Sequence, residues 1–183
     1  MIDHIRLKQK EWFDKIQPFL LKTNLNVGSG LGFFSEYAKR ANVDIASLEI
    51  SVHPGTVNQE ELVLYDGKTI PFPDEAFESV LAMYVLHHAP NPEEVLREMK
   101  RVSSRRIILV EELYKHWMGK LYLVCLDIFI NFKAGQKSRI YWGSYFNKRH
   151  FLDAVEKEGW RIVHYSSSPK AGFDEVLCVA ERP

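Results

Sequence analysis

The chain has 183 residues, 46% of them hydrophobic, and its 24 Lys and Arg residues balance its 24 Asp and Glu residues. A chain of this length buries roughly 70% of the surface that its unfolded form exposes, so we expect a single domain over residues 1–183. The formal charge of zero disfavours nucleic acid as a partner, because nonspecific binding of its backbone takes an excess of clustered cations.

The two cysteines, Cys125 and Cys178, each lie in an apolar run and lack the spaced partners of a metal site or a disulfide framework. We therefore expect two reduced thiols in the core and no metal site. The N-terminus carries charges where a signal peptide is apolar, and the apolar run at 121–130 is interrupted by Asp127. About ten residues are too few to span a bilayer, which takes about twenty, so the sequence predicts a cytoplasmic protein without membrane insertion.

In the first half of the chain, segments with helically spaced apolar residues alternate with short apolar runs typical of strands. Helical spacing of apolar residues predicts an amphipathic helix over residues 1–22, which Pro18 bends or ends. The elements expected next are a strand ending at the glycines of 28–32, a helix at 33–40, strands at 45–49, 62–65, 79–86 and 106–111, and a helix at 92–101 between the last two.

The first strand runs into three alternate glycines, Gly28, Gly30 and Gly32. Glycine tolerates positive φ and has no Cβ, so the main chain turns sharply and approaches a bound molecule closely. Acidic residues end the next two apolar runs, at Glu49 and Asp66. This repetition predicts a ligand site at the ends of neighbouring strands.

Residues 113–146 depart from the alternation, with a long apolar-rich helix, a polar stretch and an aromatic cluster. We expect this segment to be an insertion over the strand ends, as a lid or part of the substrate region. A helix at 148–158 and strands at 160–166 and 173–180 follow. The whole order predicts an α/β fold with a doubly wound, Rossmann-like, mostly parallel sheet and a C-terminal antiparallel hairpin.

These pieces resemble the class I S-adenosylmethionine-dependent methyltransferases, in particular the small-molecule branch, type 11, with the ubiquinone and menaquinone methyltransferases. The resemblance covers about 25–110 and returns at 146–160. Its motifs are the glycine loop at 26–32, the segment 66–77 that begins Asp-Gly, and the segment 85–102 that begins Val-Leu-His-His.

The resemblance implies S-adenosylmethionine as the cofactor and S-adenosylhomocysteine as the product. In such a site the glycine loop lies against the methionine end, Glu49 accepts hydrogen bonds from both ribose hydroxyls, and Asp66 accepts one from the adenine amino group. The cofactor-binding residues that it implies are Asn26, Gly28, Ser29, Gly30, Glu49, Ile50, Asp66, Gly67, Met83 and Tyr84.

Methyl transfer is an in-line displacement that needs alignment, worth roughly 7 to 11 kcal/mol, and exclusion of water. His88 is the candidate general base or substrate contact, since imidazole titrates near neutral pH, although shaping the local turn is an alternative role. Tyr145 is a candidate contact for a small-molecule acceptor. Lys137 and Arg139 are candidate contacts for an anionic one.

Two other functions compete with this interpretation. Asn26 stands where the family usually has aspartate, and the link after Glu49 is short, so a catalytically inactive, methyltransferase-like binding protein stays an alternative. A nicotinamide-dependent oxidoreductase also begins with glycines and has an acid about 20 residues later. Its fingerprint, however, requires glycine at the position of Phe33 and gives the segment 66–72 no role.

Overall fold

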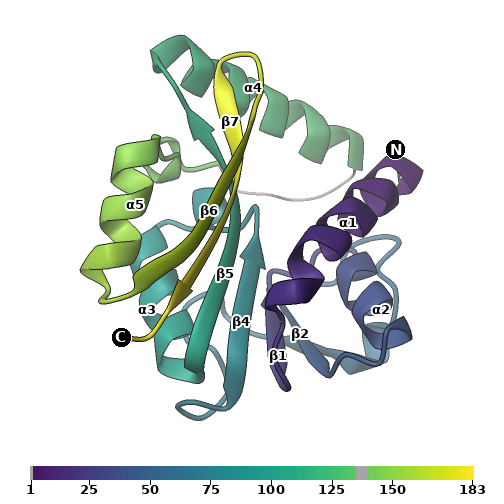
Figure 1. Ribbon diagram of the computed structural model, residues 1–183. Coiled ribbons are helices and arrows are strands. Elements are labelled where there is room, and N and C mark those ends of the chain that lie inside the picture. Colours follow the sequence, from purple (N-terminus) through teal and green to yellow (C-terminus); the bar gives the residue numbers. More distant parts are fainter. Residues whose placement is uncertain (1, 135–139) are drawn as a thin grey trace.

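The computed structural model describes residues 2–134 and 140–183, which form a seven-stranded sheet with helices on both faces (Figure 1). The strands are β1 (Asn24–Val27), β2 (Ile45–Glu49), β3 (Leu62–Leu64), β4 (Phe77–Met83), β5 (Ser103–Tyr114), β6 (Arg161–Pro169) and β7 (Phe173–Glu181). The helices are α1 (Ile2–Ile16), α2 (Phe33–Arg40), α3 (Pro92–Val102), α4 (Trp117–Ala134) and α5 (Lys148–Lys157), with short 3-10 turns η1 (Gln17–Phe19), η2 (Gln59–Glu61), η3 (Leu86–His88) and η4 (Trp142–Ser144).

The strand order is β3-β2-β1-β4-β5-β7-β6, in which β1 to β5 are parallel and β7 is antiparallel to both of its neighbours, β5 and β6. The predicted fold class is therefore confirmed. The chain moves outward from β1 to β3 and then returns to β4 on the other side of β1. Ligands of open α/β sheets bind at such a switch point, beyond the carboxyl ends of the strands.

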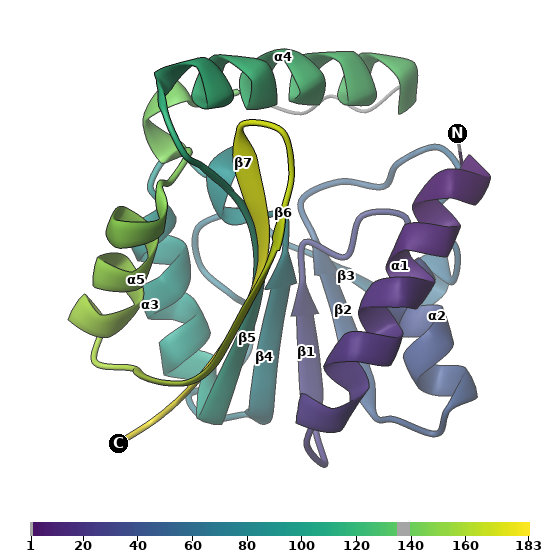
Figure 2. The ribbon, with the colours of Figure 1, turned by 45° about the horizontal axis from the view of Figure 1, so that its top comes forward.

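The central strand β4 supplies both hydrophobic layers. Val80 and Ala82 pack into the core under α3 and α5, whereas Leu81 and Met83 pack into the core under α1 and α2. Figure 2 shows the two helix pairs on opposite sides of the strands. A strand buried on both faces reads as a continuous apolar run, which is why the sequence located it.

Helix α4 belongs to neither layer. It extends across the end of the sheet to which the parallel strands point (Figure 2). Its buried residues Leu123 and Val124 form a separate cluster with Tyr145 and Phe173. A Cβ at Gly119 would come within 1.9 Å of the carbonyl oxygen of Gly172, so a close backbone contact sets α4 against the β6–β7 turn.

Several predicted details differ from the structure. Helix α1 ends at Ile16, just before Pro18, so the helix predicted to residue 22 is shorter. Strand β4 stops at Met83 instead of continuing to residue 86, because Tyr84 adopts a φ of +57° and turns the chain into η3. The prediction of two core thiols was right for Cys178 and wrong for Cys125, which is exposed on α4.

Candidate cofactor and acceptor site

The glycine loop follows β1 and is held against β2, because the amides of Gly28 and Ser29 both donate to the carbonyl of Leu48, at 2.9 and 3.0 Å. Gly28, Gly30 and Gly32 all have positive φ. A Cβ at Gly28 would lie 2.5 Å from Cγ2 of Val85, and one at Gly32 would lie 3.0 Å from the carbonyl oxygen of Val57. A Cβ at Gly30 would meet nothing within 4 Å. The chain's own packing therefore accounts for Gly28 and Gly32, and Gly30 is the glycine of this loop that faces open space.

Glu49 closes the loop from the end of β2. Its carboxylate is buried, with Oε2 accepting from the Gly30 amide and Oε1 from the Ile50 amide, both at 2.8 Å. Two carboxylate oxygens offer about four acceptor positions, so these bonds leave capacity for a ligand's hydroxyl groups. The structure thus brings Gly30 and Glu49 into direct contact.

Asp66, Gly67 and Ile50 lie together at the next strand end. Oδ1 of the exposed Asp66 accepts from the amides of Lys68 and Thr69 at 2.8 and 2.9 Å, and these hydrogen bonds lower the pKa of Asp66. A Cβ at Gly67 would lie 3.3 Å from Cγ2 of Ile50, whose side chain is 57% exposed. An ionised carboxylate beside an uncovered apolar surface suits a nucleobase, which has a polar edge and an apolar face.

Asn26 on β1 and Ser29 in the loop each have a buried oxygen without a partner, Oδ1 of Asn26 and Oγ of Ser29. The Asn26 amide donates to Oγ of Ser35 at 3.1 Å, which joins β1 to α2. Because buried polar atoms are normally paired, these two acceptors favour a polar ligand or ordered water close to the loop.

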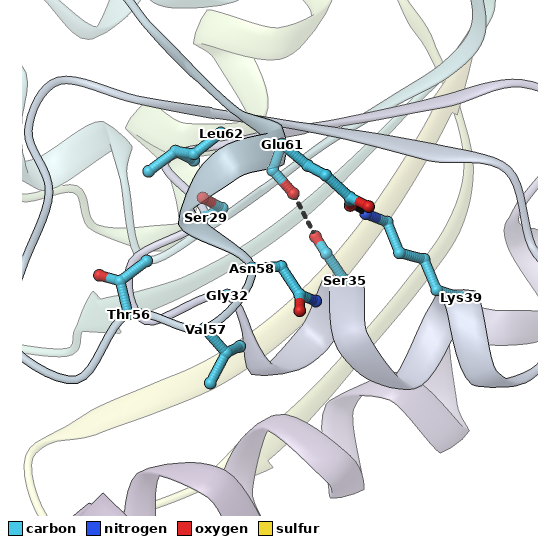
Figure 3. A pocket seen from close by; sticks show the side chains of 10 residues that line it. Ser29, Gly32, Ser35, Lys39, Thr56, Val57, Asn58, Glu61 and Leu62 are labelled. Carbon is cyan, nitrogen blue, oxygen red and sulfur yellow. Dashed lines mark hydrogen bonds and ion pairs between the residues drawn. The ribbon is translucent and has the colours of Figure 1, made fainter.

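A small hollow lies on the α2 side of the loop (Figure 3). Its walls include Ser29 and Ser35, and Lys39 and Glu61 form an ion pair beside it. The hollow encloses at most about 250 Å³, less than the roughly 300–1,000 Å³ of pockets for small molecules and cofactors. It is therefore too small for a complete nucleoside cofactor.

Met83 and Tyr84 lie at the end of β4, between the two halves of the sheet. Met83 is buried in the α1 and α2 core. The Tyr84 hydroxyl accepts from Nε1 of Trp12 at 2.7 Å and donates to Oε1 of Glu175 at 2.6 Å, and burial raises the pKa of Tyr84 well above its usual value. The Tyr84 side chain thus ties β4 to α1 and β7, a structural role that the sequence did not predict.

His87 is held in place by Glu111, which is fully buried within the adjacent strand β5. Oε1 of Glu111 accepts from the amides of Val85 and Leu86, at 3.0 and 2.8 Å, and Oε2 lies 2.6 Å from Nδ1 of His87. Burial opposes a charge on His87, but Glu111, with smaller contributions from Asp127 and Glu112, raises the pKa of His87 to about 9. His87 is therefore an imidazolium at neutral pH.

His88, Asp127 and Tyr145 meet beside this imidazolium. Oδ2 of Asp127 lies 3.5 Å from Nε2 of His87 and 3.9 Å from Nε2 of His88, and it accepts the hydroxyl of Tyr145. The Tyr145 ring is buried and stacks on His87 with 5.3 Å between ring centres. His88 is the more exposed histidine, with 27% of its side chain accessible against 4% for His87. The structure thus unites the two residues predicted to meet the acceptor, His88 and Tyr145.

Residues 25–109 match the family model described as a methyltransferase domain. An uncharacterized protein of Methanocaldococcus jannaschii is 25% identical over 91% of this chain and 83% of its own length. The demethylmenaquinone methyltransferase of Thermotoga maritima is 23% identical over 68% of this chain, which spans only 62% of that enzyme. A crystal structure of an S-adenosylmethionine-dependent methyltransferase from Methanosarcina mazei shares the fold, with a TM-score of 0.69, 17% identity, and coverage of 92% of this chain and 96% of the other.

Residues 25–109 match a methyltransferase domain, and the fold of the chain is that of the class I methyltransferases. The cofactor of this class is S-adenosylmethionine, and three observations on this methyltransferase fit it. Open space faces Gly30, the Glu49 carboxylate adjoins it, and the uncovered Ile50 lies beside Asp66.

Asp127, Glu111 and Glu112 are residues of this methyltransferase that sequence reasoning left without a role. The sequence offered two signals for these residues. Asp127 is a lone acid within the apolar run at 121–130, and Glu111 and Glu112 end a predicted buried strand, as Glu49 does. Burial raises the pKa of Glu112 to about 7. The candidates Lys137 and Arg139 lie outside the described residues.

His87, His88 and Asp127 also have the donor atoms of a cation site, since one atom from each lies within 4.8 Å of the others. A divalent cation bound there would have to displace the proton on Nε2 of His87, which Glu111 and Asp127 stabilise. We therefore keep the prediction of no metal site in this methyltransferase.

Proposed function

We propose that this methyltransferase moves the methyl group of S-adenosylmethionine to a small-molecule acceptor and releases S-adenosylhomocysteine. The observation that carries the proposal is the contact between the Gly30 amide and the Glu49 carboxylate, at the switch point of the sheet and beside open space. The bare main chain at Gly30 leaves room for the charged end of a ligand, and the buried carboxylate of Glu49 can accept hydrogen bonds from a sugar diol.

On this proposal, three groups of the chain hold the cofactor. The loop around Gly30 lies along its methionine end, Glu49 accepts from the ribose hydroxyls, and Ile50 with Asp66 receives the adenine. When bound, the cofactor supplies a methyl carbon activated by positive sulfur. The chain's task is to align the acceptor with that carbon and to keep water away.

The acceptor side lies under α4. Residues 113–146 are proposed to cover it as the substrate region, with His88 and Tyr145 as contacts. His88 is the candidate to take a proton from the acceptor, since His87 is held as an imidazolium by Glu111. Asp127 accepts the Tyr145 hydroxyl and adjoins both histidines, so it positions these groups.

A small organic acceptor is favoured over a nucleic acid by the balanced charge of the chain. The Thermotoga relative is named for demethylmenaquinone, an organic small molecule, which agrees with this class of acceptor.

A melting experiment tests cofactor binding. S-adenosylhomocysteine at one hundred times its dissociation constant adds about 2.7 kcal/mol to the stability of the folded state, whereas NADH adds nothing. Gly30→Ala removes the stabilisation by placing a methyl group in the open space. Gly55→Ala is the matched control, because Gly55 also has positive φ, at +87°, and lies in the link after β2.

Two results would decide against the proposal. Stabilisation by NADH alone, or equal S-adenosylhomocysteine binding by Gly30→Ala and the wild type, would place the pocket elsewhere. Turnover is then measured as release of S-adenosylhomocysteine with phenol, amine, thiol and quinol acceptors. Tight binding without turnover of any acceptor would support the inactive binding protein.

A further inference from the structure

Helix α4 exposes most of its large apolar side chains. A helix packed on a protein normally turns its apolar stripe inward. In α4 the inward side carries the apolar Leu123 and Val124 together with the polar Asp127 and Asn131. The outward side consists of exposed residues that recur every three or four positions, namely Trp117, Met118, Leu121, Tyr122, Cys125, Ile128, Phe129 and Phe132.

We call these eight residues the outer stripe. Trp117 is 72% exposed and Phe132 is 83% exposed, and they stand at opposite ends of the helix. Contiguous apolar surface of this kind marks a site of interaction, because water does not solvate it favourably. Within the described part of the chain, however, no helix is long and apolar enough to cross a membrane. The outer stripe is therefore suited to lie along a surface.

Charge around the outer stripe selects the kind of surface. The single acid of α4, Asp127, is turned inward toward the histidines. Two exposed lysines flank the stripe: Lys133 lies at its end, and Lys170 lies in the β6–β7 turn against which Gly119 packs. A second copy of the chain would bring these cations toward each other, whereas anionic lipid headgroups complement them.

We propose that the outer stripe of α4 docks the protein onto an anionic lipid surface. Protein faces that lie in a membrane interface carry Trp, Phe and Leu side chains, as the outer stripe does. Aromatic residues such as Trp117 and Tyr122 suit the headgroup level. Since α4 extends across the carboxyl ends of the strands (Figure 2), docking turns this end of the sheet toward the lipid.

Vesicle sedimentation tests the docking. The full chain is mixed with vesicles of phosphatidylcholine alone, or with vesicles that also contain about 30% phosphatidylglycerol. The anionic headgroups of the second kind attract basic segments of proteins. We expect binding to the anionic vesicles, weakened at high salt, and at least tenfold weaker binding by F129S/F132S. I2S/L7S is the matched control, since Ile2 and Leu7 are also exposed apolar residues but lie on α1.

A second variant separates charge from apolar contact. K133Q/K170Q retains the outer stripe, and we expect it to lose several-fold in binding to anionic vesicles and to lose most of the salt dependence. Melting curves of all variants establish that they fold. The proposal is overturned if the wild type stays in the supernatant with both kinds of vesicle, or if F129S/F132S sediments like the wild type. A lipid-free dimer that F129S/F132S dissociates, without vesicle binding by the wild type, would assign the stripe to a second copy of the chain.

Discussion

The buried imidazolium of His87 makes the stability of the fold depend on pH above neutrality. Its pKa is about 9 in the folded state against 6.5 for the exposed side chain, because the carboxylates of Glu111, Asp127 and Glu112 outweigh the cost of burial. At about 1.4 kcal/mol per pKa unit this difference corresponds to about 3 kcal/mol. A pKa raised on folding means that the contribution is complete below pH 6.5 and is lost as the pH rises through 9.

Urea unfolding at a series of pH values measures this loss. We expect the free energy of unfolding to fall by about 3 kcal/mol between pH 6.5 and 9.5, and the fall to disappear in His87→Gln. Glu112 produces a further loss of stability between pH 4.5 and 7, because burial raises its pKa to about 7. Glu112→Gln removes this loss, and it also reduces the loss from His87, because Glu112 contributes to the raised pKa of His87. Burial also raises the pKa values of Tyr65 and Cys178 to about 12, so the losses of stability from these groups begin near their ordinary pKa values of 10.0 and 9.0 and fall mostly above the range of His87.

The wild-type profile alone can refute the reasoning. Constant stability between pH 7 and 9.5 would mean that His87 is neutral in the folded state. An unchanged slope in His87→Gln would assign the titration to another group.

Two further predictions concern the cofactor site and the fold. Glu49→Gln weakens S-adenosylhomocysteine binding about 100-fold in calorimetry, since charge-assisted hydrogen bonds contribute about 1.5–3 kcal/mol each. The control, Glu60→Gln in the exposed link after β2, leaves the affinity unchanged. Equal affinities for the two variants would show that Glu49 is not part of the site. Arg101→Met lowers the free energy of unfolding by about 2–3 kcal/mol, because the guanidinium donates to the carbonyls of Phe72 and Ile70 at 2.9 and 2.8 Å and to Glu98 at 2.8 Å. Arg97→Met, at an exposed position of the same helix, is its control, and an equal loss in both variants would contradict the argument.

Local sequence determined the architecture of this protein. Alternating strand and helix patterns predicted a mostly parallel sheet, and the continuous apolar run of β4 predicted its centre. Parallel strands end at one edge, so the order of Gly30, Glu49 and Asp66 along the chain already predicted that they share that edge. The expectation of positive φ at Gly28, Gly30 and Gly32 is also confirmed.

Tertiary structure decided what each of these residues touches. Spacing shows which residues share a face but not what packs on that face, so the contact of Gly28 with Val85 and the bonds of Tyr84 to Trp12 were not predictable. Asp127 reaches the histidines from a position about 40 residues later in the sequence. The outward direction of the apolar stripe of α4 was likewise settled by the close packing of Gly119 on Gly172, because a backbone contact between distant segments fixes the rotation of a helix that has apolar residues on every side.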